Sequence, residues 1–120
     1  MMAELKRIIL EMGTGNDLHG GDYTKAAKRA VQDALHHSSL ALFKNLGIDP
    51  NTMQIELTLA AQAPDQIDVD AVAATLPYGT VKPQAVKGGL NVEDTETGDT
   101  CVIVNAGVAV WLDLPGRSES

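Results

Sequence analysis

The chain has few aromatic residues and a single cysteine. Phenylalanine, tryptophan and tyrosine together make up 3% of its 120 residues, so Val, Ile, Leu and Ala must supply the core. Small cores of this kind are often completed by oligomerisation. The single cysteine, Cys101, excludes an internal disulfide and fits a reducing compartment, so we expect a cytoplasmic protein.

Positive charge is also scarce. The chain has nine Lys and Arg residues and 16 Asp and Glu residues, which gives a net charge of −7. No run of basic residues is longer than two. Such a chain repels phosphate backbones and anionic membrane surfaces, so we expect neither nucleic acid nor a membrane as a partner. No apolar run approaches the roughly 18 residues that a membrane-spanning helix needs.

The pattern of apolar residues predicts an α+β fold. Strands are expected over residues 5–12, 53–61, 79–92 and 100–114, and helices over 23–46 and 68–76. The order is β-α-β-α-β-β in one domain over residues 1–115, with a frayed tail at 116–120. Two helices cover only one face of a single sheet, so the expected architecture is a two-layer sandwich.

The other face of that sheet is expected to be mixed in polarity. Glu56 and Thr58 would lie there among small apolar residues, because side chains alternate along the strand 53–61. Such a face suits a subunit interface, and we expect a homotrimer whose sheets close into a barrel. A monomer with a solvated sheet face is the alternative.

The stretch GTGNDLHGGD, residues 13–22, crowds four glycines around one histidine and two aspartates. It matches neither common phosphate-binding motif. Leu18 replaces the third glycine of GxGxxG, and Gly21-Asp22 stand where a P-loop needs Lys and Ser or Thr. Asp22 is also in the N-cap position of the helix that follows, so the stretch is either a site or a turn that needs glycine.

This stretch and the first helical turn after it contain three candidate catalytic residues. His19 is the natural acid–base group, because its pKa lies near neutrality and Asp17 could orient its ring. Asp17 and His19 are also acceptable ligands for a divalent metal, although no cofactor is identified. Lys25, in the first helical turn, would hold an anionic group of a substrate. The expected ligand-binding residues are Gly13, Gly15, Gly20, Asp22, Arg29 and Glu56.

Residues 13–20, GTGNDLHG, fit the pattern GxGxDxHG and are followed by DYTKAAKRAVQDAL. Together they resemble the Lin-type family of conserved hypothetical proteins over essentially the whole chain, and this resemblance implies no particular activity. The layout resembles, more loosely, the AroH-class chorismate mutases and the YjgF/RidA-type trimers. That resemblance implies ligand sites in clefts between subunits, but the catalytic residues of those families do not carry over.

Two functions stay open. The first is a small-molecule enzyme whose site lies at a subunit interface around residues 13–22, and the density of glycines and acids around His19 favours it. The second is a non-catalytic oligomeric module that binds a metabolite or a protein. The lack of a nucleophile beside the glycines favours that second function.

Overall fold

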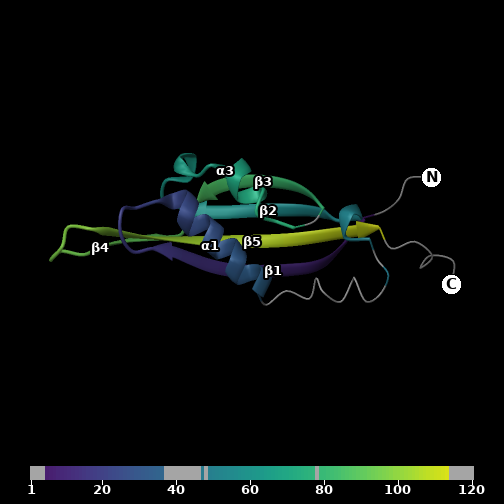
Figure 1. Cartoon of the computed structure of the whole chain (residues 1–120), viewed down its shortest axis with the longest axis horizontal. Helices are drawn as coiled ribbons and strands as arrows, with labels where there is room; N and C mark the ends of the chain where they lie inside the picture. Colours follow the sequence, from purple (N-terminus) through teal and green to yellow (C-terminus); the bar gives the residue numbers. More distant parts are fainter. Residues whose placement is uncertain (1–4, 37–46, 48, 78, 114–120) are drawn as a thin grey trace.

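The computed structural model describes residues 5–36, 47, 49–77 and 79–113, and one five-stranded sheet dominates it (Figure 1). Among these residues, two α-helices and two short 3₁₀ turns accompany the sheet. In chain order the elements are β1 (Leu5–Asp17), α1 (Tyr23–His36), η1 (Pro50–Thr52), β2 (Gln54–Ala61), η2 (Pro64–Gln66), α3 (Val69–Ala73), β3 (Thr80–Lys87), β4 (Leu90–Glu93) and β5 (Thr100–Asp113).

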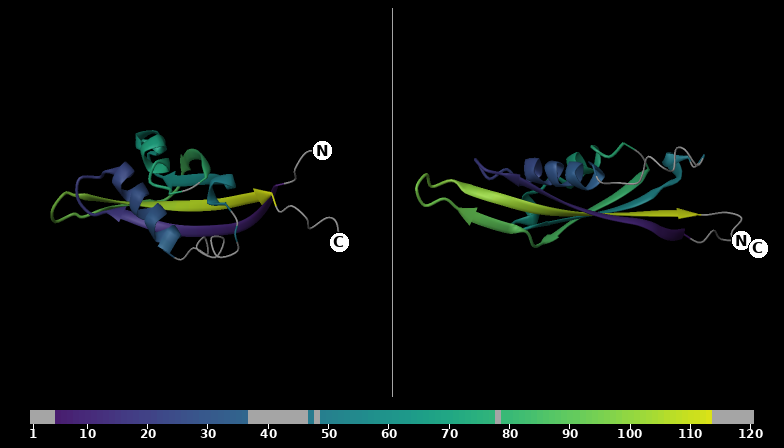
Figure 2. Two further views of the ribbon diagram at one scale, coloured as in Figure 1. Left: turned by 45° about the vertical axis from the view of Figure 1, so that its right-hand side comes forward. Right: turned by 90° about the horizontal axis from the view of Figure 1, so that it is seen from below.

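The long strand β5 lies at the centre of the sheet, whose order is β1-β5-β2-β3. β1 and β2 pair antiparallel with β5 on its two sides, and β3 pairs parallel with β2. β4 pairs with the first residues of β5, so the β4–β5 hairpin projects past the end of β2 (Figure 1). Both α-helices lie on one face of the sheet, and the described residues leave the other face bare (Figure 2).

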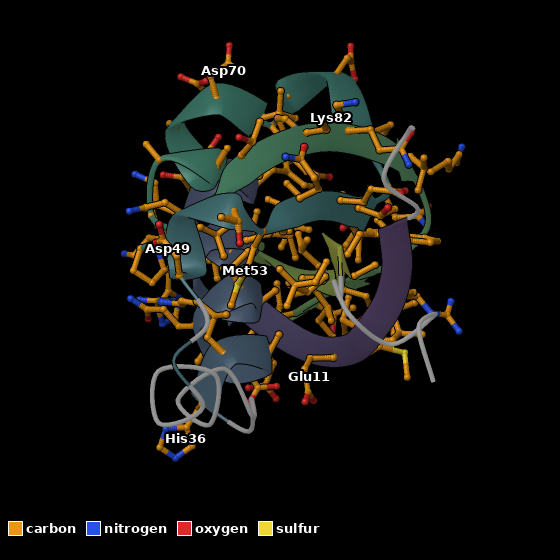
Figure 3. The ribbon with its side chains drawn as sticks, turned by 90° about the vertical axis from the view of Figure 1, so that its right-hand side faces the viewer. Glu11, His36, Asp49, Met53, Asp70 and Lys82 are labelled. Atoms are coloured by element: carbon orange, nitrogen blue, oxygen red, sulfur yellow. The ribbon has the colours of Figure 1, made fainter. Side chains whose placement is uncertain are left out.

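The core lies between the helices and the sheet. Alternate residues of β2 and β5 point into it, including Leu57, Leu59, Val104 and Val108, and all are fully buried or nearly so. Figure 3 looks along the layers and shows Met53 in the interior, whereas labelled polar residues such as Asp70 lie outside. These positions confirm the alternation that the sequence predicts for the strand 53–61, and β5 shows the same alternation.

Helix α1 packs directly on the backbone of β1. A Cβ atom at Gly13 would lie 2.3 Å from the carbonyl oxygen of Ala30, and one at Gly15 would lie 2.2 Å from that of Ala26. Both are far below van der Waals contact, so any larger residue would push the helix away. The buried alanines of α1, spaced four apart, face these glycines and complete the close approach.

The prediction of sheets closing into a trimeric barrel is wrong, because the sheet is open and the described strands β1 and β3 end it on either side. The order is β-α-β-α-β-β-β, since the predicted strand 79–92 is in fact β3 and β4. Gly88 and Gly89 separate the two. Gly89 has a φ of +63°, and a Cβ there would lie 2.3 Å from the carbonyl oxygen of Ile103. Only glycine allows the turn by which the chain leaves β3, beside β2, and enters β4, beside β5.

Two predicted boundaries also change. β1 runs to Asp17 rather than to residue 12, because Gly13 and Gly15 remain in the ladder opposite Ala106 and Val104. The first helix begins at residue 23 as predicted, but residues 37–46 and the tail at 116–120 lie outside the described residues. No helix among the described residues is long and apolar enough to cross a membrane.

Candidate functional site

Asp17, the last residue of β1, is the one charged residue that is buried in the described part of the chain. Its Oδ2 accepts a hydrogen bond from the backbone N–H of Asp22 at 2.9 Å. Its Oδ1 lies 3.9 Å from Nζ of Lys25 and 3.8 Å from Nη1 of Arg29. The carboxylate is therefore satisfied within its own chain, and it fastens the glycine turn to the start of α1.

Arg29, an expected ligand-binding residue, contacts the backbone of β1. Its Nη1 donates to the carbonyl oxygen of Asn16 at 2.7 Å. One helical turn further on, Oδ2 of Asp33 accepts from the N–H of Thr14 at 2.9 Å. Two side chains of α1 thus form hydrogen bonds with backbone groups on the outer edge of β1. Another strand would otherwise pair with these groups.

The turn between β1 and α1 needs two of its glycines for their backbone geometry. Gly20 has a φ of +87° and Gly21 a φ of +62°, a region that other residues rarely adopt. Asp22 then caps the helix, because its Oδ1 accepts from the N–H of Lys25 at 3.0 Å. The N-cap role predicted for Asp22 is confirmed.

His19 lies away from the carboxylates that the sequence places beside it. Its side chain is 80% exposed, and its Nδ1 lies 3.1 Å from Oδ2 of Asp99, in the turn before β5. The structure thus gives His19 an acidic partner, but one 80 residues further along the chain. No feature of the acidic turn at residues 93–99 indicates this pairing in the sequence.

A shallow groove of about 430 Å³ separates the glycine turn from the β4–β5 hairpin. Gly21 and Tyr23 line one side of it, and Asn91 and Asp99 line the other. The hydroxyl of Tyr23 accepts a hydrogen bond from Nδ2 of Asn91 at 2.7 Å across the groove. The exposed His19–Asp99 pair stands beside this groove, where the ring can exchange protons with solvent or with a bound molecule.

The described residues contain no group of three His, Cys, Asp or Glu side chains placed to hold a metal ion. The carboxylate of Asp17 contacts the N–H that follows the glycine turn and two cationic side chains of α1, whereas the ring of His19 contacts Asp99. A metal bound by Asp17 and His19 would therefore need further ligands from outside these residues.

Glu56, the remaining expected ligand-binding residue, lies on the bare face of the sheet. Its register partner on β5 is Ala109, whereas that of Asp17 is Val102, so seven residues (109 − 102), or about 23 Å along the strand, separate the two positions. Within one chain the structure therefore does not bring Glu56 to the glycine turn.

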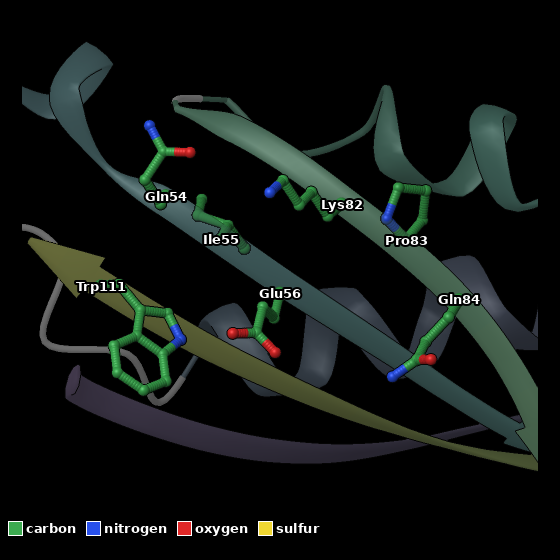
Figure 4. Close-up of a pocket in the computed structure, with 7 residues that line it drawn as sticks. All are labelled: Gln54, Ile55, Glu56, Lys82, Pro83, Gln84 and Trp111. Carbon is green, nitrogen blue, oxygen red and sulfur yellow. The ribbon is translucent and has the colours of Figure 1, made fainter. Parts of the chain in front are cut away.

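Glu56 instead lines a cavity of about 560 Å³ on the bare face (Figure 4). Gln54, Lys82, Gln84 and Trp111 contribute polar groups to the same cavity. The indole Nε1 of Trp111 is buried and has no hydrogen-bond partner among the described residues. Sequence reasoning did not find this cavity, because its residues come from three strands that only the fold brings together.

The bare face also carries exposed apolar side chains, which we call the apolar patch. Its members are 39–73% exposed and are Leu10, Met12, Val86, Leu90 and Val92. They come from β1, β3 and β4. Followed across the paired strands, their positions correspond to residues 101–109 of β5. The face is thus mixed in polarity, because Leu10 shares a row across the sheet with Glu56, and Thr14 pairs with Asn105 among the apolar positions.

Comparison with known proteins gives a family and a related fold. Residues 7–110 match the profile of a conserved hypothetical protein family, Lin0512_fam. A crystal structure of an FtsZ-like protein of unknown function from Nostoc punctiforme has a TM-score of 0.80 and 35% identity, over 94% of this chain and 100% of that one. No curated protein matches the sequence. These findings do not support the looser resemblance to chorismate mutases and YjgF/RidA-type trimers.

Proposed function

The chain belongs to the conserved hypothetical protein family Lin0512_fam, and we propose that it is a non-catalytic module that binds further copies of itself through the bare face of its sheet. The apolar patch carries this proposal. Met12 is 73% exposed and Leu90 54% exposed, on the face that no described helix covers. Five large apolar side chains exposed on one sheet face are typical of an interaction site.

The charge distribution favours a second copy as the partner. Among the strand residues whose described side chains lie on the bare face, only Arg7, Glu56 and Lys82 are charged. The chain as a whole has a net charge of −7, so most of its acids lie elsewhere. Two copies therefore repel each other least when they meet through this face.

Packing energetics point the same way. Burying one side chain the size of Leu or Met contributes about 1.5–3 kcal/mol, and each copy offers several of them. The aromatic-poor core gains less from packing within one chain than a core rich in large rings would. Association would add apolar burial that the single sheet and two helices do not supply.

The test is the mass of the protein in solution, measured by sedimentation velocity over a range of concentrations. We expect a multiple of the 12.7 kDa chain for the wild type. The double variant Met12→Lys with Leu90→Lys should shift to 12.7 kDa with unchanged circular dichroism. The matched control Gln32→Lys, on the exposed side of α1, should keep the wild-type mass. A monomeric wild type, or a double variant that still associates, would contradict the proposal.

The same sedimentation measurement gives the number of chains in the assembly. Until that measurement is made, the expected homotrimer stays a prediction. A cytoplasmic location likewise stays a prediction that rests on the single Cys101.

The small-molecule enzyme is a second candidate, and one observation favours it. The 3.1 Å contact between His19 and Asp99 stands beside the groove at the glycine turn, an arrangement that suits a general base. Asp17, which the sequence offers as the orienting carboxylate, contacts Lys25 and Arg29 instead. Turnover of a small substrate that is lost in His19→Gln, with the mass unchanged, would favour the enzyme over the proposed module.

A further inference from the structure

We infer that the cavity around Glu56 on the bare face binds a small hydroxy carboxylate. The cavity there measures about 560 Å³, which is ample for a molecule of three or four carbon atoms. It lies where β2, β3 and β5 run side by side, with Glu56 and Lys82 on adjacent strands and Trp111 across from them (Figure 4).

The hydroxyl group is inferred from Trp111 and Glu56. The indole N–H of Trp111 is buried without an acceptor in the described chain, which is an unfavourable state for a donor. In Figure 4 its nitrogen faces the carboxylate of Glu56, yet no hydrogen bond joins them. A hydroxyl between the two would accept from the indole and donate to the carboxylate, and it is among the few groups that do both.

The carboxylate is inferred from Lys82. Lys82 is the register partner of Glu56 on the neighbouring strand, but the two side chains form no ion pair. Its ammonium is thus available to an anion about one strand spacing from the hydroxyl position. Arg7, exposed and in register with Trp111, adds a second positive charge at this end of the sheet. Among the described side chains at this end of the face, two cations accompany one acid, which favours a ligand with negative charge.

This inference does not depend on self-association, because every group that it uses comes from one chain. Leu90 and Val92 of the apolar patch pair with positions 103 and 101 of β5, away from the cavity near 109–111. Leu10 and Met12 share rows with Glu56 and Gln84, but no residue of the patch contributes a group to the inferred ligand contacts. Binding of a ligand and binding of a second copy can therefore fail separately.

The chain contains one tryptophan, so its indole N–H gives a single resonance in a ¹H–¹⁵N correlation spectrum. We would titrate the full chain with lactate and malate, and with propionate and succinate, which are the same acids without the hydroxyl. We expect a saturable shift of the indole resonance with the hydroxy acids and much weaker binding of the matched acids. No saturable shift with either hydroxy acid, or equal binding of each matched pair, would overturn the inference.

Two lysine variants test whether Lys82 binds the carboxylate of the ligand. Lys82→Met should weaken binding of the hydroxy acid by about tenfold or more, because the charged hydrogen bond is lost. Lys87→Met is the matched control, since Lys87 is an exposed lysine on the same strand but on the opposite face. It should bind as the wild type does. Unchanged binding in Lys82→Met, with the sedimentation mass also unchanged, would overturn the assignment of Lys82.

Discussion

The backbones of Gly15 and Ala30 are so close that a methyl group on Gly15 would lie 2.2 Å from the amide nitrogen of Ala30. This contact joins the strand that leads into the glycine turn to the middle of α1. It explains why glycine stands in the interior of a β-strand, where it otherwise weakens the ladder. The spacing between helix and strand depends on the missing side chain.

Replacing Gly15 with alanine should therefore destabilise the protein by about 1–3 kcal/mol, because α1 must move off β1 to make room. Urea unfolding followed by circular dichroism measures the change. Gly107→Ala is the control, since a Cβ at Gly107 of β5 has no atom within 4 Å, and it should alter stability far less. Equal effects of the two substitutions would show that close packing is not the reason for Gly15.

Asp17→Ala should cost about 1–3 kcal/mol in the free energy of unfolding. The part-buried hydrogen bond from the N–H of Asp22 is lost, which accounts for most of the loss. Lys25 and Arg29 are 54% and 47% exposed at their side chains, so water can solvate both cations once the carboxylate is gone. Asp17→Asn, which keeps an acceptor oxygen, should lose less. Equal losses for Asn and Ala would indicate that the charge, rather than the acceptor oxygen, is decisive.

His19→Gln should leave the free energy of unfolding within about 0.5 kcal/mol of the wild type, because the side chain is 80% exposed and its contact with Asp99 is at the surface. Thermal unfolding of His19→Gln and Asp99→Asn tests this. If either change lowered stability by several kcal/mol, the contact would be a structural tie between the glycine turn and the hairpin rather than an available functional pair.

The turn before β5 should respond to acid at Asp94. The N–H of Glu96 and the hydroxyl of Thr97 lower the pKa of the Asp94 carboxyl below about 3.9, the value in an unstructured chain. Because the pKa is lowered on folding, the stabilisation of the turn is present above about pH 4 and is lost as the pH falls through the folded pKa. A carbon-detected NMR titration measures the midpoint. A midpoint at or above about 3.9 would contradict the hydrogen bonds.

Local pattern predicted the strands well and the contacts between distant segments poorly. β2 was predicted from alternation and β5 from its apolar residues, which are both properties of consecutive residues. The N-cap role of Asp22 likewise depends only on the residues after it. Gly13 and Gly15 were read as part of a loop, since glycine is usually a strand breaker. What keeps them in the strand is α1, and no nearby residue reveals that packing.

The candidate sites show the same limit. His19 was recognised as a candidate acid–base residue, but its partner Asp99 comes from a hairpin that only the fold places beside it. Glu56 was recognised as a polar residue on the second face, yet its neighbours Lys82 and Trp111 are brought to it by strand order. Register across strands, rather than composition, determines these neighbourhoods.

The edges of the sheet restrict how copies of this chain can add to one another. On β1, the N–H of Thr14 and the carbonyl of Asn16 are already bonded to side chains of α1. At the other end of the strand order, Pro83 in β3 has no N–H to offer. Strand-by-strand growth into fibrils is disfavoured at both edges, so concentrated solutions of the folded protein should resist amyloid conversion.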